Sequence, residues 1–427
     1  MTPQIKQRIE QIRRGEVPEG YKKTKVGIVP EEWEEGFLGN YIQEYKELSN
    51  DIEKYPVYSS SRQGLIPQSQ YYDNREAVET NLGYKIVPNG YVTYRHMSDD
   101  DVFHFNVNNT GGEILVSSEY PVFSSTEKSS LGYIIPMLND TARFRYFCRT
   151  QKMGGTRTRL YYKNLCNYKS VFPPFAEQEK ISAILQTQDK VIELQQKKIG
   201  ELKKLKKVYL SKMFPQKGCN VPEIRFPGFT APWEQRKVFE LAEKTYGGGT
   251  PATSNEAFWN GNIPWIQSSD IVDGKLFGVE PRKHITQEGL NNSATQLVPE
   301  NSIAIITRVG VGKLAFMPFP YTTSQDFLSL SKLNTEPFFT VYACYKKLQS
   351  ELNTVQGTSI KGITKDELLA KIIMVPEYAE QQQIGAFFRN LDNLITLHQR
   401  KCDEEKQKKK ALMQLLLTGI VRVKYDT

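Results

Sequence analysis

The chain has 427 residues, which is the length of two to three ordinary domains, and a formal net charge of +8. A positive charge of this size permits a nucleic-acid partner without requiring one. No apolar run reaches the roughly 18 residues that span a bilayer, and the chain does not begin with an apolar signal core, so we expect a cytosolic protein.

Cysteine and histidine give no sign of a stabilising or catalytic metal. The 5 Cys are odd in number, widely spaced and without a Cys-x-x-Cys pair, and none of the 4 His has a partner at ligand spacing. The sequence therefore predicts neither a disulfide framework nor a metal site.

The predicted elements begin with a short helical arm over residues 1–20. Residues 21–175 then carry short apolar and aromatic runs between Gly, Pro, Asn and Ser, such as Gly90–Tyr94, and residues 216–378 have the same texture, as in Ser302–Thr307. Such runs are typical of strands. We expect two domains with mixed α/β cores.

Each of these domains is followed by one long predicted helix, over residues 176–215 and 379–420. Both helices start at a Pro-x-x-Ala-Glu-Gln motif and continue for nearly forty residues without Pro and almost without Gly. Apolar residues recur at alternating steps of four and three, which makes one stripe that needs a partner. We expect the helices to pair with each other; the alternative is that each packs on its own domain.

Much of the positive charge lies in these helices. From Glu177 to Phe214 there are nine Lys against five acidic residues, and from Glu380 to Thr418 seven Lys and Arg against five, so the segments contribute +4 and +2 of the +8. The simplest interpretation is that these lysines only solvate a long helix.

The two halves of the chain are copies of each other. A shift of 203 residues superimposes residues 154–214 on 357–417 without a gap, with 17 of 61 positions identical. A repeat this long indicates a duplicated domain, because solenoid periods are about 20–50 residues. We expect pseudo-two-fold symmetry.

Three segments look like catalytic or cofactor motifs but are incomplete. Gly310–Lys313 lacks the earlier Gly and the following Ser or Thr of a phosphate loop, and Gly247–Thr250 is not a dinucleotide-binding Gly-x-Gly-x-x-Gly. Phe172–Phe175 lacks the leading Asp or Asn of an amino-methyltransferase motif. We therefore predict no catalytic, cofactor-binding or metal-binding residue in this chain.

Several motifs, in this order on a duplicated frame, resemble the specificity (S) subunit of type I restriction-modification systems. They are Tyr21–Trp33, Gly248–Pro251, Ile263–Ile271 and the two Pro-x-x-Ala-Glu-Gln segments, each with its long helix. The resemblance covers nearly the whole chain.

This resemblance implies a non-catalytic, bacterial DNA-reading subunit with two target-recognition domains, each binding one half of a bipartite, asymmetric site. The long helices would form an antiparallel coiled-coil spacer that docks two methyltransferase subunits, with separate restriction and motor subunits. S-adenosylmethionine, ATP and Mg²⁺ would be used by those partners. Because little net charge lies outside the helices, we expect the partners to supply part of the basic clamp and this chain alone to bind DNA weakly.

Polar loop residues are the candidates for contact with DNA, because Arg, Lys, Asn, Gln and Ser are the usual readers of base edges. In the first domain these are Tyr58, Ser59, Ser60, Ser61, Arg62 and Arg95, and Thr156, Arg157 and Arg159 suit phosphate contact. In the second domain they are Gly249, Thr250, Gln267, Ser268, Ser269 and Arg308, with Lys361 as the counterpart of the first-domain phosphate loop. For any one of them the alternative is an ordinary surface turn.

Two other functions remain open at this point. A coiled-coil scaffold without sequence-specific DNA binding would explain the helices but not the paired polar loops. A self-sufficient DNA methyltransferase or nuclease would require a cofactor motif that the sequence lacks.

Overall fold

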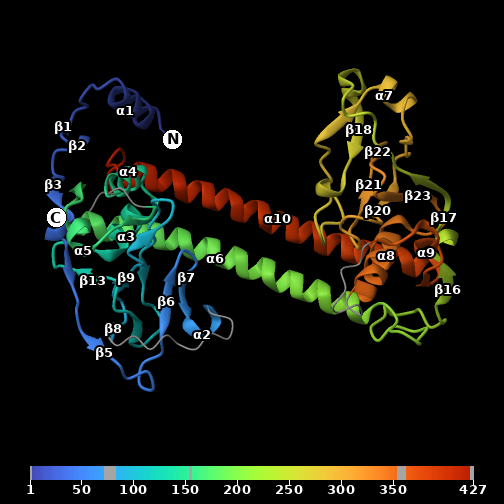
Figure 1. Ribbon diagram of the computed structural model, residues 1–427, viewed down its shortest axis with the longest axis horizontal. Coiled ribbons are helices and arrows are strands. Elements are labelled where there is room, and N and C mark those ends of the chain that lie inside the picture. The colour runs from blue at the N-terminus through green and yellow to red at the C-terminus, as the bar shows by residue number, and fades with distance from the viewer. Residues whose placement is uncertain (1, 72–82, 153–155, 353–361, 424–427) are drawn as a thin grey trace. The chain divides into compact units, whose positions relative to one another are not determined.

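The chain forms two compact units in a computed structural model that describes residues 2–71, 83–152, 156–352 and 362–423. One unit comprises Met1–Leu194 and Cys402–Thr427, and the other comprises Gln195–Lys401. The longest helices, α6 (Phe175–Lys212, green) and α10 (Tyr378–Leu416, red), each contribute to both units (Figure 1). No helix in the described residues is long and apolar enough to cross a membrane.

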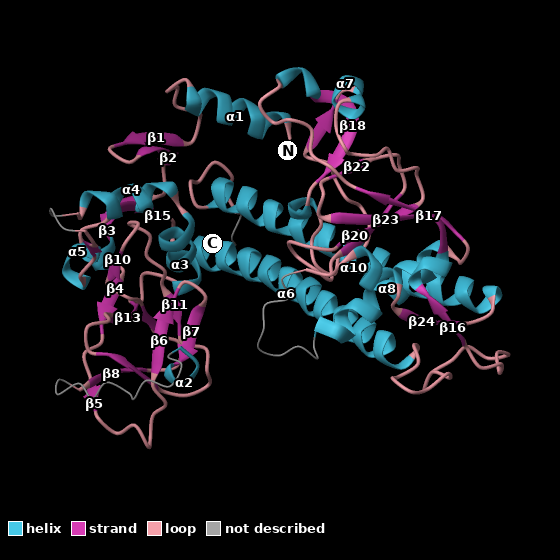
Figure 2. Ribbon diagram, turned by 45° about the vertical axis from the view of Figure 1, so that its right-hand side comes forward, coloured by secondary structure: helices cyan, strands magenta, loops and turns pink. Residues whose placement is uncertain are grey.

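The first unit is a mixed α/β domain built from short antiparallel strands (Figure 2). Its larger sheets have the orders β11-β9-β13-β4 and β12-β8-β5. The strands are β1 (Tyr21–Thr24), β2 (Gly27–Pro30), β3 (Glu34–Phe37), β4 (Ile42–Glu44), β5 (Leu48–Ser49), β6 (Tyr58–Ser61), β7 (Gly64–Pro67), β8 (Tyr84–Val87), β9 (Val92–Thr93), β10 (Met97–Ser98), β11 (Asn106–Val107), β12 (Ile114–Ser117), β13 (Val122–Ser125), β14 (Thr158–Arg159) and β15 (Lys169–Phe172). The helices are α1 (Pro3–Arg13), α2 (Gln68–Tyr71), α3 (Leu131–Asp140), α4 (Ala142–Thr150) and α5 (Tyr162–Cys166), with the 3-10 turn η1 (Leu38–Asn40).

The second unit has the same class of architecture around longer strands. Its main sheet has the order β17-β23-β20-β21, and β22 adds in parallel to β18 in a sheet of order β19-β18-β22. The strands are β16 (Glu234–Lys237), β17 (Ala242–Gly247), β18 (Trp259–Ile266), β19 (Lys283–Ile285), β20 (Ser302–Ile306), β21 (Leu314–Met317), β22 (Thr322–Thr323), β23 (Phe327–Leu333) and β24 (Ile372–Val375). The helices are α7 (Gln287–Asn291), α8 (Pro337–Leu352) and α9 (Lys365–Leu369), with the 3-10 turns η2 (Val238–Leu241), η3 (Glu256–Phe258) and η4 (Ser268–Asp270).

The repeat predicted from the sequence is visible in the strand pairing. β3 pairs with β15 just before α6, and β16 pairs with β24 just before α10. β15 and β24 occupy the same positions after the 203-residue shift, and β3 and β16 each follow a buried Trp, Trp33 or Trp233. The predicted fold class, two similar mixed α/β domains joined by long helices, is confirmed.

The glutamine of the repeated Pro-x-x-Ala-Glu-Gln motif has the same contacts in both units. Gln178 donates to the carbonyl oxygen of Pro173 (2.9 Å) and accepts from the backbone N–H of Ser130 (3.0 Å). Gln381 likewise donates to Pro376 (2.8 Å) and accepts from the N–H of Glu336 (2.9 Å). The motif therefore fixes the start of each long helix against the helix α3 or α8 of its own domain.

Most of the predicted apolar stripe of the long helices is buried, and the two helices run antiparallel. In the first unit, Ile181 near the start of α6 shares a core with Leu416 at the end of α10, whereas Gln188 further along α6 bonds to Glu405. In the second unit, the side chain of Gln195 is hydrogen-bonded to His398 (2.8 Å), and Lys206 forms an ion pair with Asp392. In both units, residues further along α6 therefore contact residues earlier in α10. The two helices therefore pair with each other as predicted, and each also packs on the domain cores.

One ion pair is made twice, by residues that are equivalent in the repeat. Lys409 Nζ lies 2.6 Å from Asp189 Oδ1 in the first unit, and Lys206 Nζ lies 2.6 Å from Asp392 Oδ1 in the second. The aspartates are 203 residues apart, as are the lysines, so the Asp comes from α6 in one unit and from α10 in the other. The same contact is therefore made once in each unit, with the roles of the two helices exchanged.

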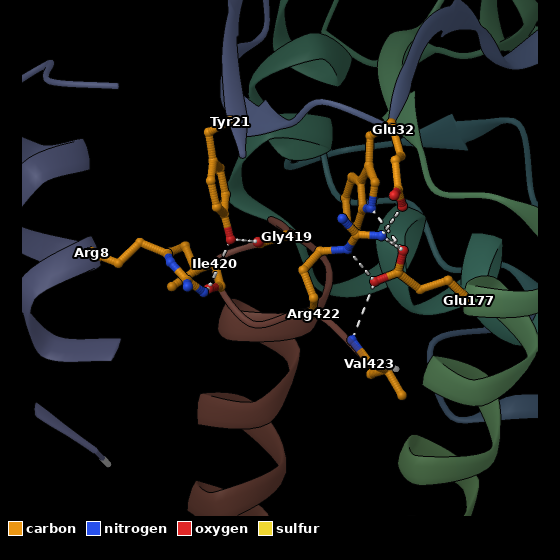
Figure 3. Close-up of polar contacts among 9 residues, drawn as sticks. Arg8, Tyr21, Glu32, Glu177, Gly419, Ile420, Arg422 and Val423 are labelled. Atoms are coloured by element: carbon orange, nitrogen blue, oxygen red, sulfur yellow. Dashed lines mark hydrogen bonds and ion pairs between the residues drawn. The ribbon is translucent and has the colours of Figure 1, made fainter. Parts of the chain in front are cut away.

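The two ends of the chain meet at the start of α6 (Figure 3). The fully buried Glu177 accepts hydrogen bonds from Arg422 (2.8 and 2.9 Å), from the backbone N–H of Val423 (3.2 Å) and from Trp33 Nε1 (3.0 Å). Tyr21 donates to the carbonyl oxygen of Gly419 (2.8 Å). The tail after α10 is thereby fixed against the N-terminal hairpin β1–β2.

The second unit has a similar buried pair at the start of α10. Arg225, in the segment that follows α6, donates to both carboxylate oxygens of the fully buried Glu380 (2.7 and 2.8 Å). In both units, the segment after one long helix therefore neutralises the buried Glu at the start of the other.

Candidate DNA-recognition interface

An open, mostly polar pocket of about 520 Å³ lies in the first unit, where the β6–β7 hairpin meets the loop after β9. Nine of the thirteen lining residues are polar, whereas small-molecule sites are lined predominantly by apolar side chains. The lining residues are Ser60, Ser61, Arg62, Gln63, Ile66, Arg95, Met97, Ser98, Asp99, Asp100, Val102, Phe103 and His104. Four of them, Ser60, Ser61, Arg62 and Arg95, are residues predicted to contact DNA.

Hydrogen bonds from one asparagine hold the β6–β7 hairpin in place. Asn106 Nδ2 donates to Ser60 Oγ (2.8 Å) and to the carbonyl oxygen of Ser61 (2.9 Å), and Ser61 Oγ donates across the turn to the carbonyl oxygen of Gly64 (2.9 Å). Ser59 and Ser60 are buried, and Tyr58 packs on the small cluster around Val87. These predicted residues position the hairpin, whereas the tip that carries Arg62 is exposed.

Two exposed arginines converge on the acidic loop after β10. Arg62 forms an ion pair with Asp100, and Arg157 Nε lies 2.8 Å from Asp99 Oδ1. The hydrogen bond from Arg62 lowers the pKa of Asp100 below its ordinary value, so this carboxyl is ionised at neutral pH. Arg62, a predicted base contact, and Arg157, a predicted phosphate contact, are far apart in the sequence but are thus brought to the same loop.

The remaining first-domain candidates lie close to this loop. Arg159 follows Thr158 in β14, which pairs with β10, and Thr156, Arg159 and Arg95 are exposed. Gly154 and Gly155 of the predicted phosphate loop lie outside the described residues. DNA contact by each of these residues stays a prediction.

In the second unit, the predicted Gly249–Thr250 segment packs on the turn between β22 and β23. Gly249 donates its backbone N–H to Thr323 (2.8 Å) and accepts at its carbonyl oxygen from Trp265 Nε1 (3.0 Å). Thr250 Oγ1 donates to the exposed Gln325 (2.6 Å). Trp265 is buried, as expected of a core residue.

Gln267, Ser268 and Ser269 lie at the end of β18 and join the same region. The backbone N–H of Ser324, in the β22–β23 turn, donates to the carbonyl oxygen of Ile266 (2.9 Å). Asp270 accepts from the backbone N–H of Gln267 (3.0 Å), so it caps this turn as expected. Ser269 is exposed, and Gln267 and Ser268 are half-buried.

Arg308 follows β20, and the residue before it is hydrogen-bonded to the β22–β23 turn. The backbone N–H of the preceding Thr307 donates to the carbonyl oxygen of Asp326 (2.7 Å), and the Arg308 side chain is exposed. Lys361 lies outside the described residues. Thr250, Gln267 and Arg308, which the sequence separates by up to about sixty residues, are thus gathered around the turn Ser324–Asp326.

Some polar residues at these two surfaces were missed by sequence reasoning. In the first unit they are the acidic loop residues Asp99 and Asp100; in the second they are Gln325, which bonds to Thr250, and Arg282, whose Nε lies 3.5 Å from Asp270 Oδ1. The only signal for the two aspartates was that they belong to a run of three acidic residues, which is also typical of an ordinary solvated turn. Among the described residues, no group of three or more His, Cys, Asp or Glu could hold a metal ion.

Gly248 is required where the glycine segment passes the β22–β23 turn. A Cβ atom there would lie 1.8 Å from the backbone oxygen of Ser324, whereas a Cβ on the neighbouring Gly247 would meet nothing within 4 Å. We expect Gly248→Ala to lower the free energy of unfolding of the second unit by about 1–3 kcal/mol, because the added methyl group is overpacked. Gly247→Ala should have a much smaller effect. Thermal unfolding of both variants checks this, and equal losses would contradict it.

Comparison with known proteins gives one consistent family. The family model of the type I restriction modification DNA specificity domain matches the chain twice, over residues 30–204 and 231–406. A putative type I restriction enzyme MjaX specificity subunit from Methanocaldococcus jannaschii is 23% identical over 430 residues, covering 95% of this chain and 97% of the relative. The EcoR124I/EcoR124II specificity subunit of Escherichia coli is 32% identical over 159 residues, covering 35% of this chain and 39% of the relative.

Solved structures share the fold at low sequence identity. A chain from a type I restriction-modification system superimposes with a TM-score of 0.54 at 17% identity, covering 92% of this chain and 99% of that one. The S subunit of a type I system from M. genitalium gives a TM-score of 0.54 at 12% identity, covering 92% and 97% of the two chains.

Proposed function

Since the chain belongs to the type I restriction-modification DNA specificity family and recognises a DNA target as a non-catalytic subunit, we propose that it reads a bipartite, asymmetric sequence, one half with each unit. The observation that carries this proposal is the presence of a separate polar surface in each copy of the duplicated frame. The surfaces differ in side chains, which favours two different half-sites over a palindrome. A coiled-coil scaffold would not need these two polar surfaces, and a self-sufficient methyltransferase or nuclease would not need one in each unit.

The chemistry of the two surfaces suits base reading. Arg62 and Arg95 in the first unit, and Gln267 and Arg308 in the second, are of the residue types that reach base edges in the major groove. Each is positioned by backbone contacts of neighbouring residues and carries an accessible side chain. A reader of this kind needs no reactive group of its own, because it only places the DNA for its partners.

The partners are proposed to be two methyltransferase subunits, which dock on the long helices, and restriction and motor subunits. Leu194 on α6 and Leu397 on α10 are equivalent in the repeat, and 65% and 46% of their surfaces are exposed. That both copies of the repeat leave the same apolar position exposed supports the proposal that another protein covers it. S-adenosylmethionine, ATP and Mg²⁺ would be bound by these partners.

Electrostatics supports assembly before tight DNA binding. Two of the arginines that would face DNA are paired with carboxylates, Arg62 with Asp100 and Arg157 with Asp99. Because neutralisation of phosphates supplies much of the affinity for DNA, we expect the isolated chain to bind weakly and the methyltransferase partners to complete the positive clamp.

Genome-wide adenine methylation tests the proposed function. Cells that carry this chain with its methyltransferase partner are compared with cells that lack only this chain. We expect a bipartite motif that appears only with the chain and changes in one half when one domain is exchanged. An unchanged methylome, with the complex folded and expressed, would contradict the proposal and favour a scaffold.

Arg95 and Arg308 each follow a strand in their own unit, β9 or β20, and we expect them to do analogous work. Arg95→Ala should weaken recognition only of the half-site read by the first unit, and Arg308→Ala only of the other, each by about 1–3 kcal/mol if a bidentate base contact is lost. The methylated motifs of the two variants provide the measurement. Equal loss in both half-sites would count against this assignment.

A further inference from the structure

Arg62 and Asp100 present a hydrogen-bond donor and an acceptor next to each other in the first-unit pocket. Their side chains are 58% and 51% exposed, so both remain accessible while paired. Asp100 also accepts from Ser98 Oγ (2.9 Å) and from the backbone N–H of Val102 (3.3 Å). These bonds fix the carboxylate, and the guanidinium is held against it.

One oxygen of this carboxylate is left for a ligand. The bonds from Arg62, Ser98 and Val102 all end on Asp100 Oδ1, which leaves Oδ2 for a further donor within the part of the chain that the structure describes. The lowered pKa of Asp100 keeps the group ionised, and an ionised carboxylate only accepts hydrogen bonds. Its ligand must therefore offer an N–H or O–H group.

Phosphate cannot be that ligand, since it offers only acceptors and is negatively charged. In the major groove, a G·C base pair presents two acceptors on guanine, N7 and O6, beside one donor, the N4 amino group of cytosine. Arg is the commonest partner of those guanine atoms, and Asp accepts from the cytosine amino group. Adenine is matched instead by the amide of Asn or Gln.

We propose that Arg62 and Asp100 act as one unit that reads a single G·C base pair in the half-site of the first unit. Asp100 determines specificity in two ways, since it accepts from cytosine and holds Arg62 in the plane of the guanine edge. It also repels the DNA backbone, so binding without the matching base pair is disfavoured. The inference rests on the proposed function, because it assumes that this unit reads DNA.

The chain offers conservative variants to test this pairing. Arg62→Lys keeps the positive charge but removes the planar fork of donors, and Asp100→Asn keeps the shape but removes the negative charge. Glu127→Gln makes the same change of charge on an exposed carboxylate of the same unit, outside the pocket. Each full-length variant is expressed with the methyltransferase partner, and the methylated motif is determined.

We expect Arg62→Lys and Asp100→Asn to relax the same single position, a G·C pair in the natural motif, by about tenfold to a hundredfold in discrimination. The other half of the motif should stay intact in both variants, which also reports that the complex is folded, and Glu127→Gln should keep the natural motif. Relaxation at two different positions, an equal fall in methylation at all sites, or the same change with Glu127→Gln overturns the inference. If the natural chain itself specifies no motif, the proposed function fails instead.

Discussion

Replacing Arg422 with alanine is expected to lower the free energy of unfolding of the first unit by about 3–5 kcal/mol. The reason is that Glu177 is fully buried and would lose two of its hydrogen bonds and its only described opposite charge. The remaining bonds from Trp33 and Val423 do not neutralise it. Urea unfolding of the full-length chain, followed by circular dichroism, measures the loss.

Glu32 supplies a matched control for this prediction. It also pairs with Arg422 (2.5 Å), but its side chain is 60% exposed, so Glu32→Ala should cost no more than about 1 kcal/mol. Joint replacement of Arg422 and Glu177 by leucine should recover part of the stability, because no buried charge is then left unpaired. Similar losses for Arg422→Ala and Glu32→Ala would show that Glu177 does not depend on its arginine.

Identical substitutions in the two copies of the helix ion pair are expected to have different costs. The side chains of Lys206 and Asp392 are 10% and 17% exposed, whereas those of Lys409 and Asp189 are 24% and 55% exposed. Lys206→Ala would leave a poorly solvated carboxylate, for a loss of about 3 kcal/mol, while Lys409→Ala should cost about 1 kcal/mol or less. The difference in thermal unfolding between the two variants checks the prediction.

The hydroxyl of Tyr342 also donates a hydrogen bond to Asp392 (2.6 Å). This bond should reduce the loss of stability caused by Lys206→Ala, because it still stabilises the Asp392 carboxylate. The double variant Lys206→Ala with Tyr342→Phe should therefore lose more stability than the sum of the two single variants. Additive losses, or equal losses from Lys206→Ala and Lys409→Ala, would mean that burial does not set the strength of the pair.

The sequence was sufficient for the duplicated frame, the long helices and the fold class. The stripe of apolar residues is regular over many turns, and Ile181, Leu185 and Phe388 are almost completely buried, as the periodicity required. The repeated Pro-x-x-Ala-Glu-Gln motif marked the start of each helix, because its glutamine has the same structural contacts in both copies.

The pairing of short strands and the loop contacts could not be predicted. A strand such as β9 has two residues, so its alternation of side chains gives no register. The junction of Arg422 with Glu177 joins residues 245 positions apart, and the clustering of Arg62 with Asp100 depends on how two irregular loops meet. Neither has a periodic signal in the sequence. The same is true of the candidate site. Its polar residues could be predicted from residue type and position in loops, but their contacts with one another could not.

The exchanged ion pair has a consequence for the ancestry of the protein. Each half of the chain carries one aspartate and one lysine of the pair, Asp189 with Lys206 and Asp392 with Lys409. A protein with a single half would therefore carry both partners of the pair, so that the same contact could form between two copies of it. Duplication and fusion of such a half would leave each recognition domain free to change independently, without any change to the helices that join the halves.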